Sequence, residues 1–278
     1  MSNGVKINEK CYKFEEKKFN CGLLDESVDA TYIIHLEGNG RLNHIYDQLK
    51  KFHPTKIVFI VFNKGYKLGN KHLCENSTRA DLIDAFLTVM KDAENKKYNN
   101  ILILEDDFEF NTKIHDVSIC TEINEFINDK SLTDQSFIYI LGCVPFVQAP
   151  YYKNTYLNMF SLGMHACIYS KMARHTFLQF DQALMIDWDF ISGILARRYL
   201  YKEPLCYQLF PETENSKNWT GYHQLLIKII FKWLHMDTIA EPGYSYFYTF
   251  SKLFFWIEII FTILFLFGLY FMYLYLVR

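Results

Sequence analysis

Short apolar runs alternate with helically spaced apolar residues in the first half of the chain. The runs cover residues 32–36, 56–62 and 101–104, and polar positions bound each of them. Runs of this length predict buried strands, whereas apolar residues that recur every three or four positions predict helices at 41–52 and 78–98. This strand–helix order predicts an α/β fold in which helices flank a sheet.

The same criteria extend the pattern into the second half of the chain. We expect strands at residues 137–141 and 165–169, each a short run rich in apolar side chains. Helices are expected at residues 171–179 and 188–201.

A long apolar stretch closes the chain. Residues 253–277 are apolar apart from Glu258, and residues 259–277 carry no charge. About 20 apolar residues in a helix span the roughly 30 Å of hydrocarbon in a bilayer. Aromatic side chains at both ends of the stretch match the preference of such rings for the membrane interface. The pattern predicts one transmembrane helix.

The segment before this helix is amphipathic. Apolar side chains at Leu225, Leu226, Ile229, Ile230, Trp233 and Leu234 form one face, and Lys228 and Lys232 lie on another. Such a helix either lies in the headgroup region of a membrane or packs against its own domain, and both interpretations stay open. Because lysines precede the span and only Arg278 follows it, we expect a single-pass C-terminal anchor with the soluble domain in the cytoplasm.

Composition narrows the choice of partners. The 29 Lys and Arg residues nearly balance the 31 Asp and Glu residues, and no basic stripe with interleaved aromatics is present, so nucleic acid is not expected as a partner. Seven cysteines without a CxxC pair favour reduced thiols.

Residues 1–29 are polar and charged. We therefore expect a polar segment at 1–29, a folded domain at 30–220, an amphipathic segment at 221–252 and a transmembrane helix at 253–277.

Three adjacent acids follow the apolar run at residues 101–104. Side chains alternate along an extended backbone, so Glu105 and Asp107 should face one way and Asp106 the other. Adjacent carboxylates repel one another when they lose hydration, and a cation relieves that cost. Oxygen ligands without nearby His or Cys suit Mn²⁺ or Mg²⁺. Glu105 and Asp107 are therefore predicted metal ligands, with a solvated turn as the alternative.

A second acidic pair, Asp187 and Asp189, precedes the helix expected at residues 188–201. Aspartate at this position commonly caps a helix. One carboxylate can cap while the other serves as a base, so capping and catalysis both remain open.

In order along the chain, these pieces resemble glycosyltransferase family 25, over roughly residues 31–219. The strand Ile33-Ile34-His35-Leu36 with Arg41 looks like the opening motif of the family, and Leu102-Ile103-Leu104-Glu105-Asp106-Asp107 is similar to its acidic signature. The later Ala166-Cys167-Ile168-Tyr169-Ser170, Asp187 and the stretch Pro204 to Gln208 are similar to later segments of the family.

The resemblance implies a GT-A-like fold and a nucleotide-diphosphosugar donor, most simply a UDP-sugar. It implies Mn²⁺ or Mg²⁺ on Glu105 and Asp107, and transfer to a hydroxyl of a glycan, lipid or protein acceptor with inversion. Asp187 or Asp189 would act as the base. The donor site would include His35, Leu36, Arg41, Arg79 and Asp106.

Two other interpretations remain open at this point. A nucleotidyltransferase, or another metal-dependent enzyme acting on phosphate esters, would need the same carboxylates. A membrane-tethered binding or scaffold protein would keep the acidic strand end without activity.

Overall fold

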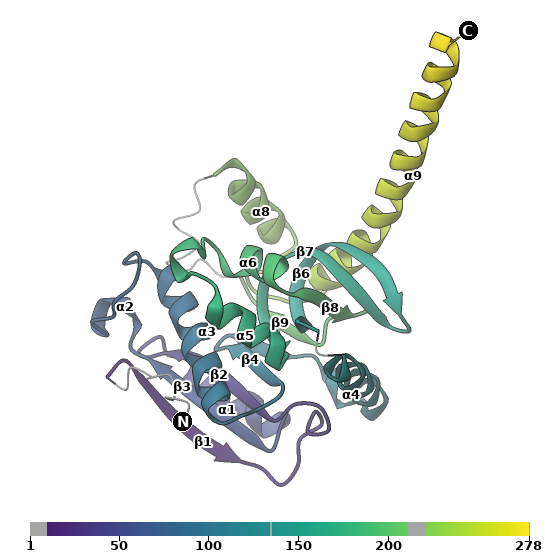
Figure 1. Ribbon diagram of the computed structural model, residues 1–278. Coiled ribbons are helices and arrows are strands. Elements are labelled where there is room, and N and C mark those ends of the chain that lie inside the picture. Colours follow the sequence, from purple (N-terminus) through teal and green to yellow (C-terminus); the bar gives the residue numbers. More distant parts are fainter. Residues whose placement is uncertain (1–9, 134, 211–220, 278) are drawn as a thin grey trace.

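The computed structural model describes residues 10–133, 135–210 and 221–277 (Figure 1). Residues 211–220, at the end of the expected domain, lie outside the described residues. The strands are β1 (Tyr12–Lys18), β2 (Ala30–Leu36), β3 (Ile57–Asn63), β4 (Ile101–Glu105), β5 (Phe108–Phe110), β6 (Phe137–Tyr152), β7 (Thr155–Tyr169), β8 (Arg197–Tyr201) and β9 (Cys206–Gln208). The helices are α1 (Leu42–Lys51), α2 (Gly65–Leu68), α3 (Thr78–Asn95), α4 (Val117–Leu132), α5 (Lys171–Gln179), α6 (Trp188–Leu195), α8 (Tyr222–Trp233) and α9 (Gly243–Val277), with 3₁₀ turns at Thr112–His115 and Gln182–Leu184.

Seven strands form one mixed sheet in the order β1-β3-β2-β4-β7-β6-β8. The neighbours β2, β3 and β4 are parallel, whereas β1 and β7 run antiparallel to the strands beside them. The predicted α/β class with a mixed sheet and flanking helices is confirmed. Strands β5 and β9 form a separate two-stranded sheet.

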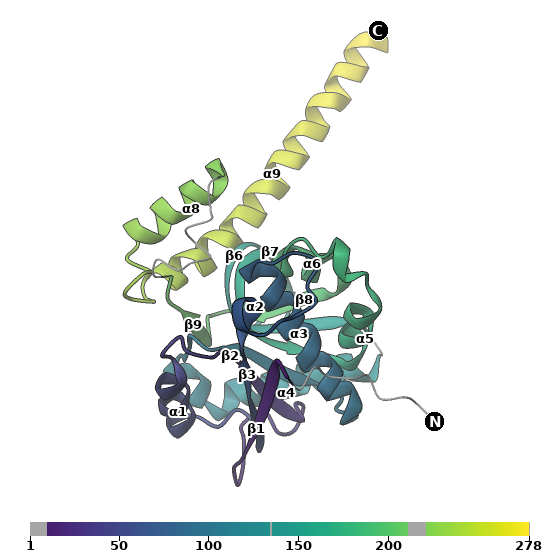
Figure 2. The same ribbon diagram turned by 90° about the vertical axis from the view of Figure 1, so that its left-hand side faces the viewer.

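Helices cover both faces of the central strands (Figures 1 and 2). Ile103 packs on one face with Phe86 of α3 and Phe177 of α5, while Leu102 and Ile45 of α1 belong to the core of the other face. Because both faces are buried, β2, β3 and β4 read as continuous apolar runs, which is why the sequence revealed them.

The sheet begins earlier than the expected domain boundary at residue 30. Strand β1 pairs antiparallel with β3, from Tyr12 opposite Asn63 to Lys18 opposite Ile57. It is an edge strand, and its Lys and Glu side chains are partly or fully exposed. That polar sequence hid the strand in the segment assigned to residues 1–29.

The prediction of a helix over residues 188–201 is wrong for its second half. Helix α6 ends at Leu195, and Ala196 adopts an extended backbone. Residues Arg197–Tyr201 then form β8, parallel to β6. The apolar run Tyr199-Leu200-Tyr201 is buried in the sheet, and such a short run does not by itself distinguish a strand from a helix. Strands β6 and β7 also extend beyond the expected limits, as a long bulged hairpin.

Helix α9 starts inside the folded domain and continues without interruption to Val277. Its first turns are buried at Gly243, Tyr244, Tyr248 and Ser251. The remainder projects away from the domain with its apolar side chains exposed (Figures 1 and 2). Among the described residues this is one helix long and apolar enough to cross a membrane. The amphipathic segment and the transmembrane segment expected from sequence are therefore not separated at residue 252.

Candidate functional site

The three adjacent acids lie where β4 ends. Glu105 is the last residue of the strand, and residues 106 and 107 form a turn into β5. Strand β2 runs parallel beside β4, so Leu36 at its end lies at the same edge of the sheet. Ligands of open α/β sheets bind at this edge, outside the carboxyl ends of the strands.

Asp106 is enclosed by hydrogen-bond donors. Its Oδ2 accepts from the backbone N–H of Leu36 at 3.0 Å and from Asn39 Nδ2 at 2.6 Å, and it lies 3.0 Å from His35 Nδ1. Its Oδ1 accepts from Arg41 Nη1 at 2.9 Å. Burial alone would raise the pKa of Asp106, but these donors outweigh burial and hold its pKa below the usual value. This carboxylate ties the end of β2 to the end of β4.

Arg41 joins two of the acids. Its Nη1 lies 2.9 Å from Asp106 Oδ1 and 2.9 Å from Asp107 Oδ2. Strict alternation predicted opposite directions for these two carboxylates, but the strand stops at Glu105 and the turn lets both reach one guanidinium. Burial opposes the charge of Arg41, yet the neighbouring Asp107 and Asp106 prevail and raise its pKa.

Asp107 has a second partner from far along the chain. Gln208 Nε2 donates to Asp107 Oδ1 at 2.9 Å, because β5 and β9 pair with Phe108 opposite Gln208. Burial nevertheless raises the pKa of Asp107, despite the opposing effects of Arg41 and Gln208. One positive charge does not fully compensate this group of acids.

The charged form of Glu105 is strongly disfavoured by its surroundings. Burial and the neighbouring Asp107 and Asp189 carboxylates raise its pKa well above the ordinary value. Within the described residues its side chain has no hydrogen-bond donor. Glu105 is therefore a carboxylate that a cation would stabilise strongly.

Asp189 lies close enough to influence Glu105, and its backbone partners fix its position. It accepts hydrogen bonds from the N–H groups of Gly163, at 2.6 Å, and Met164, at 3.2 Å, in β7. Burial and the charge of Asp187 raise the pKa of Asp189 to about 6. A carboxyl group with such a pKa is suited to accept a proton near neutral pH.

Asp187 has the capping role. It is the N-cap of α6, and its carboxylate accepts from the N–H of Phe190 at 3.0 Å. Its side chain is exposed. Of the two aspartates, Asp189 is the one whose charge raises the pKa of Glu105.

Gly163 links the two acidic groups. Its φ of +62° lies in the left-handed region that favours glycine. A Cβ at this position would lie 3.7 Å from Oε1 of Gln208 and 3.3 Å from the ring of Phe210. Gly163 therefore donates to Asp189 on one side and borders the Gln208 amide that holds Asp107 on the other.

The acids fit a divalent cation that also binds a phosphorylated ligand. No three His, Cys, Asp or Glu side chains in residues 10–133, 135–210 and 221–277 are grouped as ligands of one metal ion. Mg²⁺ commonly takes only one or two carboxylates and completes its shell with waters and substrate phosphates. Glu105 offers a carboxylate without a donor, and each oxygen of Asp107 keeps a second lone pair.

The other residues expected at the donor site separate into two groups. His35 is buried against Asp106, and the side chain of Leu36 is exposed at the same strand end. Arg79 lies in the first turn of α3 and pairs with Glu75 at 2.7 Å on the surface. This partner, Glu75, is not one of the acids at the end of β4.

Sequence reasoning missed two partners of the acids, Asn39 and Gln208, and the residue that holds Gln208, Tyr244. Asn39 lies in the loop three residues after the end of β2, and this position near the strand end could have identified it as a candidate. Gln208 lies in the stretch 204–208 that resembles the family, but its contact with Asp107 depends on the long-range pairing of β5 with β9. Tyr244 in α9 accepts from the N–H of Gln208 and donates to its carbonyl oxygen, and no sequence signal points to that contact.

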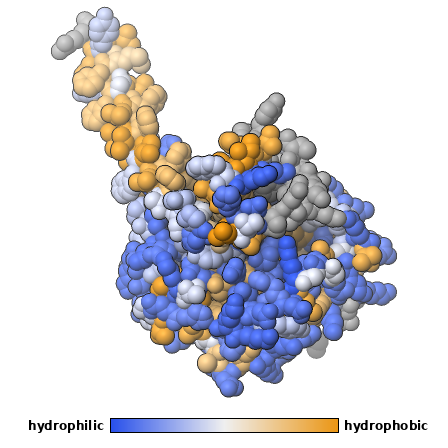
Figure 3. All heavy atoms as spheres, turned by 180° about the vertical axis from the view of Figure 1, so that it is seen from behind, coloured by the Kyte–Doolittle hydropathy of each residue, from blue (hydrophilic) through white to orange (hydrophobic). Residues whose placement is uncertain are grey.

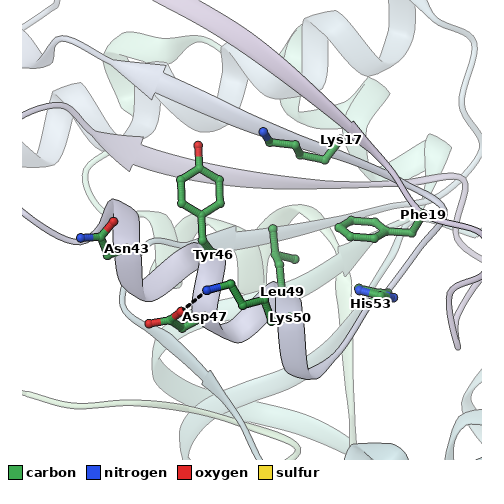
Figure 4. Close-up of a pocket in the computed structure, with 8 residues that line it drawn as sticks. All are labelled: Lys17, Phe19, Asn43, Tyr46, Asp47, Leu49, Lys50 and His53. Carbon is green, nitrogen blue, oxygen red and sulfur yellow. Dashed lines mark hydrogen bonds and ion pairs between the residues drawn. The ribbon is translucent and has the colours of Figure 1, made fainter.

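A separate groove lies between β1 and α1, on a different part of the domain (Figure 4). Its volume is about 610 Å³, and Lys17, Phe19, Tyr46, Lys50 and His53 are among its lining residues. Phe19 stacks on His53 at 3.9 Å between ring centroids. The acids at the end of β4 do not line this groove.

Comparisons with known proteins give little further information. No protein-family model and no curated protein matches the chain. Solved structures with partial similarity include A197 from STIV, with 14% identity over 65% of this chain and 85% of that chain at a TM-score of 0.36. Another is apo UDP-glucose pyrophosphorylase, with 9% identity over 62% of this chain and 72% of that chain at a TM-score of 0.32. Similarities this weak support no argument about the site.

Proposed function

We propose that the protein is a membrane-anchored glycosyltransferase with a GT-A-like fold, which moves a sugar from a nucleotide-diphosphate donor to an acceptor hydroxyl. One observation carries the proposal: Glu105 and Asp107 follow one another at the end of a parallel strand, the charges of Asp107 and Asp189 both raise the pKa of Glu105, and Arg41 is in direct contact with Asp107. Such an excess of negative charge at a ligand-binding edge suits a cation bound together with a diphosphate.

In this proposal Glu105 and Asp107 hold Mn²⁺ or Mg²⁺. The bound ion would neutralise the charge that develops on the departing diphosphate. Gln208 and Arg41 orient Asp107, and Asp106 fixes Arg41 together with the end of β2. Arg41 is about one third exposed, so part of its guanidinium is open to an anionic donor.

Asp189 is the proposed base. It accepts the proton of the acceptor hydroxyl as the oxygen attacks the anomeric carbon, while the bond from that carbon to the diphosphate oxygen breaks. Nucleoside diphosphate leaves, and a single displacement inverts the anomeric centre. Two backbone N–H groups hold the carboxylate, so its direction is fixed before the substrate binds.

The apolar helix α9 supports the membrane part of the proposal. We infer a single-pass anchor with the folded domain on the cytoplasmic side, because lysines precede the span. The acceptor is a glycan, lipid or protein hydroxyl, and the donor is a UDP-sugar.

The test is turnover of a panel of nucleotide sugars by the full chain in detergent, with Mn²⁺ or with a chelator. We expect metal-dependent release of nucleoside diphosphate from one donor, reduced at least 100-fold in Asp107→Asn. The matched control is Glu109→Gln, an exposed acid two residues away. Release of pyrophosphate from a nucleoside triphosphate and a sugar phosphate would instead identify a nucleotidyltransferase. A folded protein that binds no nucleotide with any metal would favour the scaffold alternative.

A further inference from the structure

Helix α8 is fixed against the base of α9 by one of its faces. Phe231 is buried, with its ring centroid 4.4 Å from that of Phe210 and 5.9 Å from that of Phe247 in α9. Ile227 and Leu234, four residues before and three after Phe231, pack against the same core. This face explains how the helix is held to the domain.

A second apolar face of α8 remains uncovered. Leu225, Leu226, Ile229 and Trp233 are between 52% and 76% exposed. The sequence pattern grouped Ile230 and Leu234 with these residues, but both are partly buried. Packing against the domain thus uses a different face of the helix, and it does not account for the exposed side chains. We call these four residues the α8 apolar surface.

The α8 apolar surface lies beside the proposed membrane anchor. Helix α8 borders the base of α9 on the side of the domain from which α9 projects (Figures 1 and 2). Exposed apolar side chains continue along α9 from Phe250 and Leu253 onward. Figure 3 shows hydrophobic side chains along α9 and beside its base, on a face of the domain that is otherwise largely hydrophilic.

Lipid is the occupant that this arrangement favours. A helix that lies flat on a bilayer buries its apolar face at the boundary between headgroups and acyl chains. Trp233 is an amphipathic ring suited to that depth, and the neighbouring exposed Lys232 can extend its ammonium group to the headgroups. Because α9 is continuous from the domain to its last turn, it brings any bilayer it enters close to α8.

We propose that the α8 apolar surface inserts into the same membrane leaflet that α9 enters, so that the domain is held against the bilayer at two points. The proposal rests on the membrane-anchoring part of the proposed function. It does not depend on the donor or on the reaction.

The test uses nitroxide labels on the full chain reconstituted into phosphatidylcholine vesicles. Cys21 and Cys74 are the exposed cysteines of the described residues, so both are first changed to Ser. A label is then placed at Ile229→Cys, at Leu132→Cys on the exposed end of α4 as the aqueous control, and at Phe261→Cys within α9 as the bilayer control. Collision with oxygen, which concentrates in lipid, is compared with collision with a water-soluble nickel chelate.

The measured quantity is the ratio of the collision rate with oxygen to the collision rate with the nickel chelate. We expect this ratio to be several-fold higher for the label at residue 229 than for the label at residue 132, and close to the ratio for the label at residue 261. Equal collision ratios at residues 229 and 132, with a high ratio at residue 261, would show that α9 is in the membrane and α8 is not, and would overturn the proposal. Protection of residue 229 from both reagents would also overturn it and indicate a second copy or another protein on this surface. An aqueous value at 261 would show that the anchor itself had failed.

Discussion

The hydroxyl of Tyr244 donates a hydrogen bond to the carbonyl oxygen of Gln208 at 3.0 Å and accepts one from the N–H of the same residue at 2.9 Å. Gln208 in turn holds Asp107 through its side-chain amide. Tyr244 is the second residue of α9, about 14 Å along the helix from Leu253 at a rise of 1.5 Å per residue. The proposed anchor and the proposed metal ligand are therefore joined through one glutamine.

Tyr244→Phe should weaken this connection. The substitution leaves the N–H and C=O of Gln208 without their partner, which costs about 1–3 kcal/mol for a buried group. We expect a lower midpoint in thermal unfolding and slower donor turnover. Tyr246→Phe is the matched control, because Tyr246 is exposed two residues away and should change neither quantity. A normal midpoint for Tyr244→Phe would mean that water replaces the hydroxyl.

Arg41→Gln should reduce both stability and acid sensitivity. The guanidinium is about one third exposed, so its loss costs about 1–2 kcal/mol. The folded state lowers the pKa of Asp106, so this carboxylate contributes stability above its unfolded pKa of about 3.9 and loses it as the pH falls through the lower folded pKa.

Denaturant unfolding from pH 7 down to pH 3 checks the Arg41 prediction. The stability of Arg41→Gln should fall less steeply toward acid than that of the unchanged protein. Arg79→Gln removes an exposed pair with Glu75 and should leave the curve unchanged. If Arg79→Gln instead weakened donor binding strongly without changing stability, Arg79 would belong to the donor site as the sequence predicted.

Glu105→Gln should have opposite effects with and without metal. Removing this charge relieves repulsion from Asp107 and Asp189, so the metal-free variant should unfold at a higher temperature. It should also lose the further stabilisation that Mn²⁺ with nucleoside diphosphate gives the unchanged protein. Differential scanning calorimetry with and without chelator measures both effects. A variant that is less stable without metal would contradict the assigned repulsion.

Asp189 should set the acidic limb of the pH profile. Its pKa of about 6 means that the base is protonated below this value, so kcat/KM should rise with pH and level off above about 6. Asp189→Asn should abolish turnover. Asp187→Asn should keep turnover but move the limb to lower pH, because the charge of Asp187 helps to raise the pKa of Asp189. Its stability should change little, since asparagine caps a helix about as well as aspartate. The reverse outcome would assign the base to Asp187.

The pH dependence of folding gives a second measurement on Asp189. The folded state raises its pKa from an unfolded value of about 3.9, so ionisation of this group costs stability progressively as pH rises from about 4 to 6. The penalty is absent below that window and complete above it. Asp189→Asn should remove this decline, even if the lost backbone acceptor lowers stability at every pH.

The sequence predicted those parts of the fold that local patterns determine. Buried strands such as Ile101–Glu105 are apolar up to their last residue, and Asp187 caps α6 where such a residue favours a helix start. The end of β4 was therefore visible as a candidate site. Two features escaped because their cause is distant: β1 is polar at a sheet edge, and Gln208 reaches Asp107 only after β5 and β9 have paired.

Strand β1 also has a consequence for how the sheet meets other molecules. It covers the backbone of β3, whose sequence from Ile57 to Asn63 is almost entirely apolar, and it presents charged side chains to solvent. An unpaired apolar strand is a template for strands of other chains, and charged edge strands prevent such pairing. A shortened chain that starts at residue 30 should therefore aggregate, although it would retain every candidate site residue.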